Sequence, residues 1–138
     1  MTLCLHLNAA LASLALGGML ALGACATAPA PAIAPNGLAE LMERPGERAL
    51  IEGIRAYDDG QYAQAESSLR KALGAGLASA RDRASAHKLL AFITCTSNRL
   101  ADCETAFRAA RAADPAFVLS RSEAGHPQWG PVYRKVLP

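Results

Sequence analysis

The stretch GIRAYDDGQYAQAESSLRKAL, residues 53–73, sets the pattern of this chain, because small and larger apolar residues recur in it at helical spacing. A second stretch, LAFITCTSNRLADCETAFRAARAADP at residues 90–115, follows the same order. When Ala72 is superposed on Ala110, small residues align with small residues and large apolar residues with large ones. We conclude that the two stretches are copies of one structural unit.

The spacing within each copy resembles that of the tetratricopeptide repeat, a helix–turn–helix unit of about 34 residues. In such a unit, facing small side chains let two antiparallel helices approach closely, and a bulky residue fills the space beside them. The two copies are offset by 38 residues, and we expect the excess to form a longer loop over residues 74–82. Asp114-Pro115 is expected to end the second copy, because proline cannot continue a helix.

We therefore predict an all-α fold for residues 38–138, a short array of two helix–turn–helix repeats with a C-terminal capping helix. Gly60 and Asn98 are expected at the two tight turns, because both residue types tolerate left-handed backbone. The repeats should span about residues 46–73 and 82–115, with helices near 46–58, 61–73, 82–96 and 100–113 after a short leading helix over 38–43.

Residues 117–138 are predicted to cap the array, because two repeats alone bury little apolar surface. The apolar run 117–119 needs cover, and a last helix is expected to begin within 126–133, where prolines suit a first turn. Trp129 and Tyr133 are expected to pack on the second repeat. The alternative is that these aromatic side chains dock a partner.

The chain opens with an apolar stretch in which residues 3–24 contain no Lys, Arg, Asp or Glu. Its apolar core matches the hydrophobic region of a signal peptide better than a membrane span of about 20 residues. Leu22-Gly23-Ala24-Cys25 resembles the lipobox of bacterial lipoproteins, in which the cysteine is lipidated and the preceding bond is cut. The resemblance implies a signal peptide over residues 1–24 and acyl chains at Cys25. An uncleaved anchor is the alternative.

Residues 25–37 contain three prolines and predict an extended tether between the lipid and the folded domain. Ala26 stands where an Asp favours inner-membrane retention in enterobacterial lipoproteins. The resemblance therefore implies anchoring at the periplasmic face of the outer membrane, an oxidising compartment.

Cys95 and Cys103 are the cysteines that remain for the folded domain once Cys4 and Cys25 are assigned to the N-terminal region. They fall on successive antiparallel helices, either side of the turn at Asn98. Because side chains lean toward the N-terminus of their helix, the axial gap between the two sulfurs closes. We predict a Cys95–Cys103 disulfide. Two buried thiols used as small apolar residues are the alternative.

In tetratricopeptide proteins, the first helix of each repeat lines a concave peptide-binding face. Carrying these positions over predicts a partner groove with an apolar stripe and charges of both signs at its edges. The alternative is that these residues face the capping tail and form core. The positions are Glu47, Leu50, Ile54, Tyr57 and Asp58 from the first copy, and Ser85, Lys88, Phe92 and Thr96 from the second.

No catalytic or metal-binding pattern accompanies the repeats. His87 and His126 are separated and lack ligand spacing with the two cysteines, and no nucleophile motif occurs. The formal net charge of +2 is too small to indicate a nucleic-acid partner. We expect neither an enzyme nor a cofactor, and protein partners rather than nucleic acid.

HKLLAFITCTSNRLADCETAFRAARAADPAF at residues 87–117, EAGHPQWGPVYR at 123–134 and the lipobox together resemble the TssQ-type lipoproteins associated with bacterial type VI secretion. The resemblance implies a non-catalytic accessory component that docks to other envelope proteins of a secretion machine. A pilotin-like lipoprotein that escorts a secretin or pilus component is the alternative. A cell-wall hydrolase or its activator is a third, less favoured class, and the oligomeric state stays open.

Overall fold

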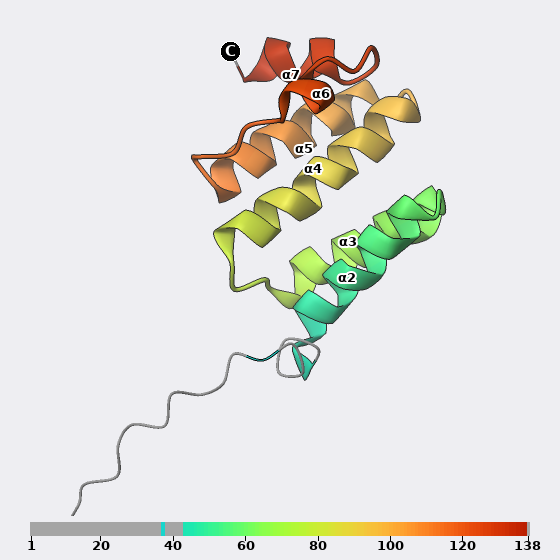
Figure 1. The fold of residues 1–138 in the computed structure, drawn as a ribbon, viewed down its shortest axis with the longest axis vertical. Helices are drawn as coiled ribbons and strands as arrows, with labels where there is room; N and C mark the ends of the chain where they lie inside the picture. Colours follow the sequence, from blue (N-terminus) through green and yellow to red (C-terminus); the bar gives the residue numbers. More distant parts are fainter. Residues whose placement is uncertain (1–36, 38–42, 138) are drawn as a thin grey trace, which may run out of the picture. The chain divides into compact units, whose positions relative to one another are not determined.

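The computed structural model describes Gly37 and residues 43–137 of the 138-residue chain. The predicted signal peptide, Cys25, nearly all of the tether and most of the leading helix lie outside these residues. Within them, six helices follow one another: α2 (Pro45–Asp58), α3 (Tyr62–Ala75), α4 (Ala80–Thr96), α5 (Leu100–Ala113), α6 (Arg121–Ala124) and α7 (Gly130–Val136) (Figure 1).

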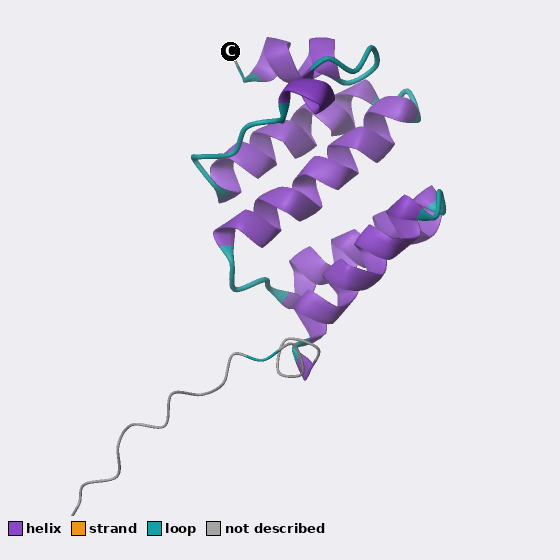
Figure 2. Ribbon diagram, viewed as in Figure 1, coloured by secondary structure: helices purple, strands orange, loops and turns teal. Residues whose placement is uncertain are grey.

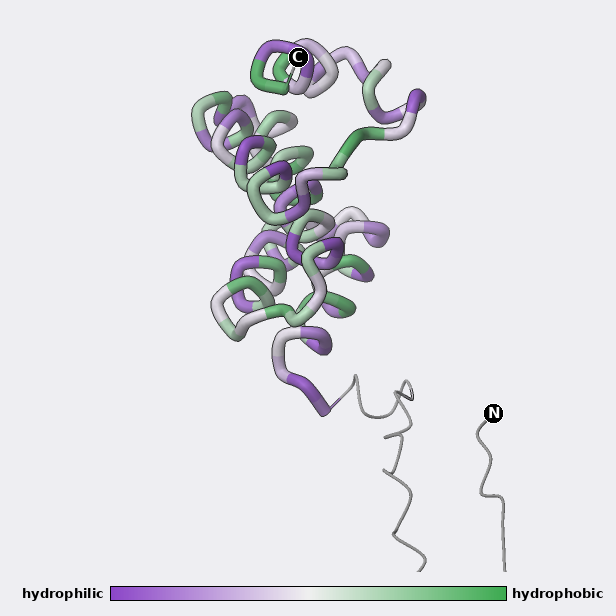
Figure 3. The backbone as a smooth tube through the Cα atoms, turned by 90° about the vertical axis from the view of Figure 1, so that its left-hand side faces the viewer, coloured by the Kyte–Doolittle hydropathy of each residue, from purple (hydrophilic) through white to green (hydrophobic). Residues whose placement is uncertain are grey.

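The described part of the chain consists of helices joined by loops, and no strand occurs in it (Figure 2). Helices α2 and α3 pack as one antiparallel pair, and α4 and α5 as a second (Figure 1). The predicted fold class is therefore confirmed as a small all-α, tetratricopeptide-like array with a C-terminal cap. Hydrophobic and hydrophilic residues are mixed along α2, α3 and α5, as expected where one face of a helix is buried (Figure 3). Helix α4 differs, because residues 89–95 are all buried.

The first pair packs closely because α2 presents Gly53 to α3. A Cβ atom at Gly53 would lie 2.8 Å from Leu69 Cγ, which is too close for any larger residue. Leu69 is fully buried, as are Ala65 and Ala72 on the same side of α3. Gly60 has a φ of 72° in the turn between the helices, where glycine avoids the strain of a side chain.

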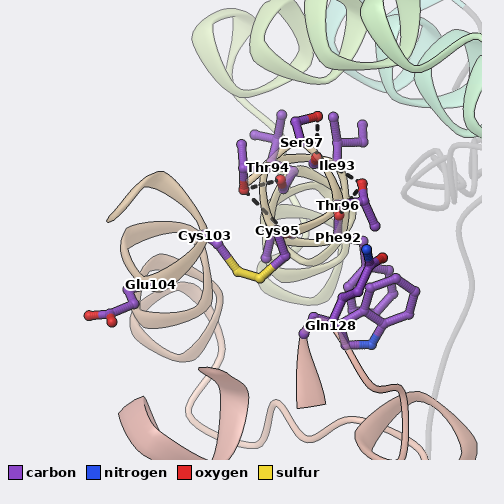
Figure 4. The surroundings of a disulfide bond; sticks show 12 residues. Phe92, Ile93, Thr94, Cys95, Thr96, Ser97, Cys103, Glu104 and Gln128 are labelled. Atoms are coloured by element: carbon purple, nitrogen blue, oxygen red, sulfur yellow. Dashed lines mark hydrogen bonds between the residues drawn. A yellow bond between two sulfur atoms is a disulfide. The ribbon is translucent and has the colours of Figure 1, made fainter. Parts of the chain in front are cut away.

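The second pair repeats this packing with its own side chains. Ala91 on α4 is fully buried, and so are Phe107 and Ala110 on α5. Asn98 forms the turn with a φ of 58°, as the sequence predicts. The predicted disulfide is present, and it joins Cys95 to Cys103 across this turn with a Cα–Cα distance of 5.1 Å (Figure 4).

An ion-pair network connects the two repeats. Glu66 on α3 accepts hydrogen bonds from both terminal nitrogens of Arg99, at 3.0 and 2.5 Å, and Arg70 adds a bond of 2.7 Å. The Arg99 hydrogen bond is the main reason that the pKa of Glu66 falls to about 2, because it outweighs the opposing effect of burial. The network therefore ties α3 to the start of α5.

The connection between the repeats is shorter than predicted. Helix α3 continues to Ala75 and α4 begins at Ala80, so much of the expected loop over residues 74–82 is helical. Ser79 caps α4 by accepting a hydrogen bond from the backbone N–H of Asp82 at 3.2 Å. This local cap starts the helix two residues earlier than the repeat pattern indicates.

The C-terminal tail contains a helix that the sequence analysis did not predict. Ser120 and Glu123 form a capping box, which starts the four-residue α6. The last helix, α7, begins at Gly130 with Pro131 in its first turn. Gly130 sits close to α6, because a Cβ atom there would lie 2.5 Å from the Ala124 carbonyl oxygen.

Candidate functional site

One stripe of α4 carries five side chains at helical spacing, and we call it the α4 face: Arg81, Ser85, Lys88, Phe92 and Thr96. Four of the five were predicted as groove residues. The C-terminal tail divides this face into a covered half around Phe92 and an open half around Arg81.

The covered half is closed by an aromatic stack. Trp129 lies parallel to Phe92 with ring centroids 4.2 Å apart, and His126 stacks on Trp129 at 3.3 Å. The indole N–H of Trp129 donates a hydrogen bond of 2.8 Å to the carbonyl oxygen of Glu123. Phe92 is consequently only 4% exposed. Phe92 is therefore a core residue. The prediction that it lines an open groove is wrong, and the alternative that it faces the capping tail applies.

The stack lies beside the disulfide. Phe92 is one turn before Cys95 on α4, and Figure 4 shows both residues in the surroundings of the disulfide. Tyr133, the other predicted cap residue, packs edge-on against Phe107 with ring centroids 5.4 Å apart. Its hydroxyl accepts a hydrogen bond of 3.3 Å from the backbone N–H of Leu119.

An ion pair marks the border between the two halves. Lys88 Nζ lies 2.6 Å from Glu123 Oε1 and 5.7 Å from the centre of the Phe92 ring. Burial alone would raise the pKa of Glu123, but hydrogen bonds from Lys88 and Ser120 outweigh it and lower that pKa below its usual value. Lys88 is therefore held against the tail, with a quarter of its side chain exposed.

The groove residues predicted on α2 also divide into buried and more exposed side chains. Leu50 is 6% exposed and belongs to the core, whereas Ile54 and Tyr57 are half-buried and pack against its edge. Burial is the main reason that the pKa of the Tyr57 hydroxyl is raised, with smaller effects from neighbouring groups that include Glu123. Asp58, like Thr96 on α4, is exposed.

Glu47 has a structural role instead of the predicted groove role. Its side chain is buried at the start of α2 and accepts a hydrogen bond of 3.5 Å from the backbone N–H of Ala78. Glu47 therefore links the start of α2 to the connection between the repeats, and Arg44 lies 3.9 Å from the same carboxylate oxygen as a second partner.

The open half of the α4 face is a pocket of 480 Å³ between α4 and the segment that follows α5. Val118 lines it with 66% of its surface exposed, whereas Phe117 and Leu119 are buried. The expectation that all of 117–119 needs cover is therefore wrong for Val118, because neighbouring side chains of an extended segment point to opposite sides. The lining residues are Arg81, Ala84, Ser85, Lys88, Asp114, Ala116, Phe117 and Val118.

Arg81, Ala84 and Ala116 are pocket residues that the sequence did not single out, whereas Val118 was named only as part of an apolar run that needs cover. The sequence holds a signal for Arg81, which lies four residues before the predicted groove position Ser85 and so shares its helix face. The sequence gives no comparable signal for Val118, because residues 117–119 are all apolar.

A second, smaller pocket of 350 Å³ lies between α3, α4 and α5. Leu73, Leu90 and Ala106 give it an apolar lining, and His87 is half-buried at its edge. Burial lowers the pKa of His87 and so favours the neutral form of its imidazole.

Within the described residues, no group of three or more His, Cys, Asp or Glu side chains is placed to hold a metal ion. In the same part of the chain, no helix has the length and hydropathy that crossing a bilayer requires. Comparisons with protein families, curated proteins and solved structures give no match to this chain.

Proposed function

We propose that this protein is a membrane-anchored adaptor that docks another protein on the open half of its α4 face. The observation that carries the proposal is Val118, a large apolar side chain that is 66% exposed beside a pocket of 480 Å³. Val118 lines this pocket together with charged and polar side chains, so a protein segment seated there would cover an apolar side chain that is otherwise in water. Exposed apolar side chains beside a polar rim are typical of protein interfaces.

The lipobox supports the membrane anchor. Leu22-Gly23-Ala24-Cys25 precedes a proline-containing tether, so acyl chains at Cys25 would hold the domain at a bilayer surface. Each buried methylene contributes about 0.8 kcal/mol, and two or three chains give stable attachment. The expected position is the periplasmic face of the outer membrane, where a disulfide can persist.

The proposed setting is a type VI secretion system, in which the protein would be an accessory component without catalytic activity. The support is the resemblance of residues 87–117 and 123–134 to TssQ-type lipoproteins, together with the lipobox. An adaptor of this kind needs a stable fold, a surface anchor and one partner site, and each has a candidate in this chain.

Site-specific photocrosslinking in intact cells tests the adaptor function. A photoreactive residue at Val118 should give a crosslink to a defined protein, because the partner covers this position. The matched control is Gln64, which is exposed on α3 and lies away from the pocket. An adduct at both positions, or at neither, would contradict the proposal.

Processing at Cys25 tests the anchor separately. Globomycin, which blocks the lipoprotein signal peptidase, should cause unprocessed precursor to accumulate, and Cys25→Ala should prevent incorporation of labelled palmitate. Normal processing of the Cys25→Ala chain would rule out the lipobox.

A further inference from the structure

We infer that the open half of the α4 face takes an extended peptide segment in which an acidic residue stands next to an aliphatic one. The inference rests on the proposed adaptor function and adds the chemistry of the partner. It follows from an arginine without a partner among the described residues, an apolar wall opposite to it, and the length of the pocket along α4.

Arg81 provides the charge. It is exposed at the rim of the pocket and forms no hydrogen bond or ion pair with the other described residues. The other charged groups of the pocket are already engaged. Lys88 pairs with Glu123 at 2.6 Å, and Asp114 accepts a hydrogen bond of 2.9 Å from the backbone N–H of Ala116.

A carboxylate is the group that Arg81 fits best, because a guanidinium can donate two parallel hydrogen bonds to its two oxygens. Binding an acidic side chain there would leave the Lys88–Glu123 pair intact. A basic side chain would instead meet Arg81 as a like charge, and this disfavours binding.

The opposite wall provides apolar surface. Phe117 and Val118 belong to the segment after α5, and Ala84 forms apolar floor on α4. Phe117 is 8% exposed and is held by the tail, whereas Val118 is free to be covered. An aliphatic side chain that packs on Val118 would remove this apolar surface from water.

The length of the pocket along α4 and its two different walls suit an extended peptide. Successive side chains of an extended segment point to opposite sides, so an acidic residue directed at α4 has neighbours directed at the 114–118 segment. Arg81 and Lys88 are about 10 Å apart along the helix axis, at 1.5 Å per residue. An extended peptide covers that length with about three residues. The pocket therefore fits an acidic–aliphatic pair within a short linear motif.

Peptide selection against two forms of the full chain tests this inference. A random-peptide library is selected on the protein purified in detergent, and in parallel on the Arg81→Glu variant. The native protein should enrich Asp or Glu next to Leu, Ile or Val, whereas Arg81→Glu should enrich Lys or Arg at the acidic position. This reversal of charge preference cannot arise from a loss of structure.

Arg48→Glu is the matched control, because Arg48 is exposed on α2 and does not line the pocket. It makes the same change in net charge and should keep the acidic preference. A labelled peptide from the native selection should bind Arg81→Glu at least about tenfold more weakly, and Arg48→Glu with unchanged affinity.

The same sequence preference for the native protein and Arg81→Glu, or no acidic enrichment at all, would overturn the inference. The outcome is distinguishable from failure of the proposed function. A specific crosslink at Val118 combined with an unchanged preference in Arg81→Glu would leave the adaptor in place and reject only the acidic–aliphatic motif.

Discussion

Replacement of Trp129 by Ala should strongly destabilise the protein, because this side chain joins the tail to the second repeat. Trp129 is 9% exposed, stacks on Phe92 at 4.2 Å and donates a hydrogen bond of 2.8 Å to the Glu123 carbonyl oxygen. Truncation of a buried aromatic residue to Ala costs about 3–5 kcal/mol. We expect the free energy of unfolding to fall by about this amount.

Trp129→Phe separates the two contributions. It retains a ring over Phe92 but loses the hydrogen bond to Glu123, and it should cost about 1–2 kcal/mol. Urea denaturation followed by circular dichroism at 222 nm measures both variants. Trp129 is the only tryptophan of the chain, so native fluorescence also reports whether the tail is docked. A loss below about 1 kcal/mol for Trp129→Ala would refute the capping role.

Four further variants test the packing of the repeats and the links within and between them. Gly53→Ala should lower the free energy of unfolding by about 1–3 kcal/mol, because its Cβ would lie 2.8 Å from a leucine side chain. Gly74→Ala has no atom within 4 Å of the new Cβ and should instead raise the free energy of unfolding by about 0.5–1 kcal/mol. Equal melting temperatures for the Gly53→Ala and Gly74→Ala variants would contradict the role of close packing at Gly53. Replacing both Cys95 and Cys103 by Ala should lower the free energy of unfolding by about 2.5 kcal/mol, because the disulfide closes a loop with a sequence separation of 8. Reduction of the native protein with dithiothreitol should destabilise it to a similar extent. The pKa of Glu66 is lowered to about 2 from its ordinary value of 4.5. The contribution of its carboxylate to the free energy of unfolding is therefore complete above pH 4.5 and is lost as the pH falls toward 2. Glu66→Gln should lower the free energy of unfolding by about 1 kcal/mol at pH 7, after allowance for solvent screening. It should also flatten the dependence of stability on pH between pH 4.5 and 2. An unchanged acid profile would count against the ion-pair network around Glu66.

Local sequence signals predicted the repeats well because close helix packing depends on which residues are small. Gly53 and Leu69 show this directly, since one makes room for the other. Glycine and asparagine marked the two turns for a comparably local reason. The capping signals at Ser79 and Ser120 were also local, and reading them would have located the start of α4 and the unpredicted α6.

The site was less predictable because it depends on the path of the tail. Phe92 and Lys88 occupy groove positions of the repeat, and the stack with Trp129 decides that Phe92 is core. Val118 lies in a non-helical segment at a place where a third repeat would have a helix, and it is 66% exposed there. These are contacts between distant parts of the chain, and a repeat pattern does not encode them.

The central claim is that Val118 contacts a protein partner and does not contribute to the stability of the fold. Val118→Asp should leave the free energy of unfolding within about 0.5 kcal/mol of the native value, because the side chain is 66% exposed. The same variant should lose the protein partner that the native chain retains in affinity purification from intact envelopes. Retention of the partner by Val118→Asp at native levels would contradict the account.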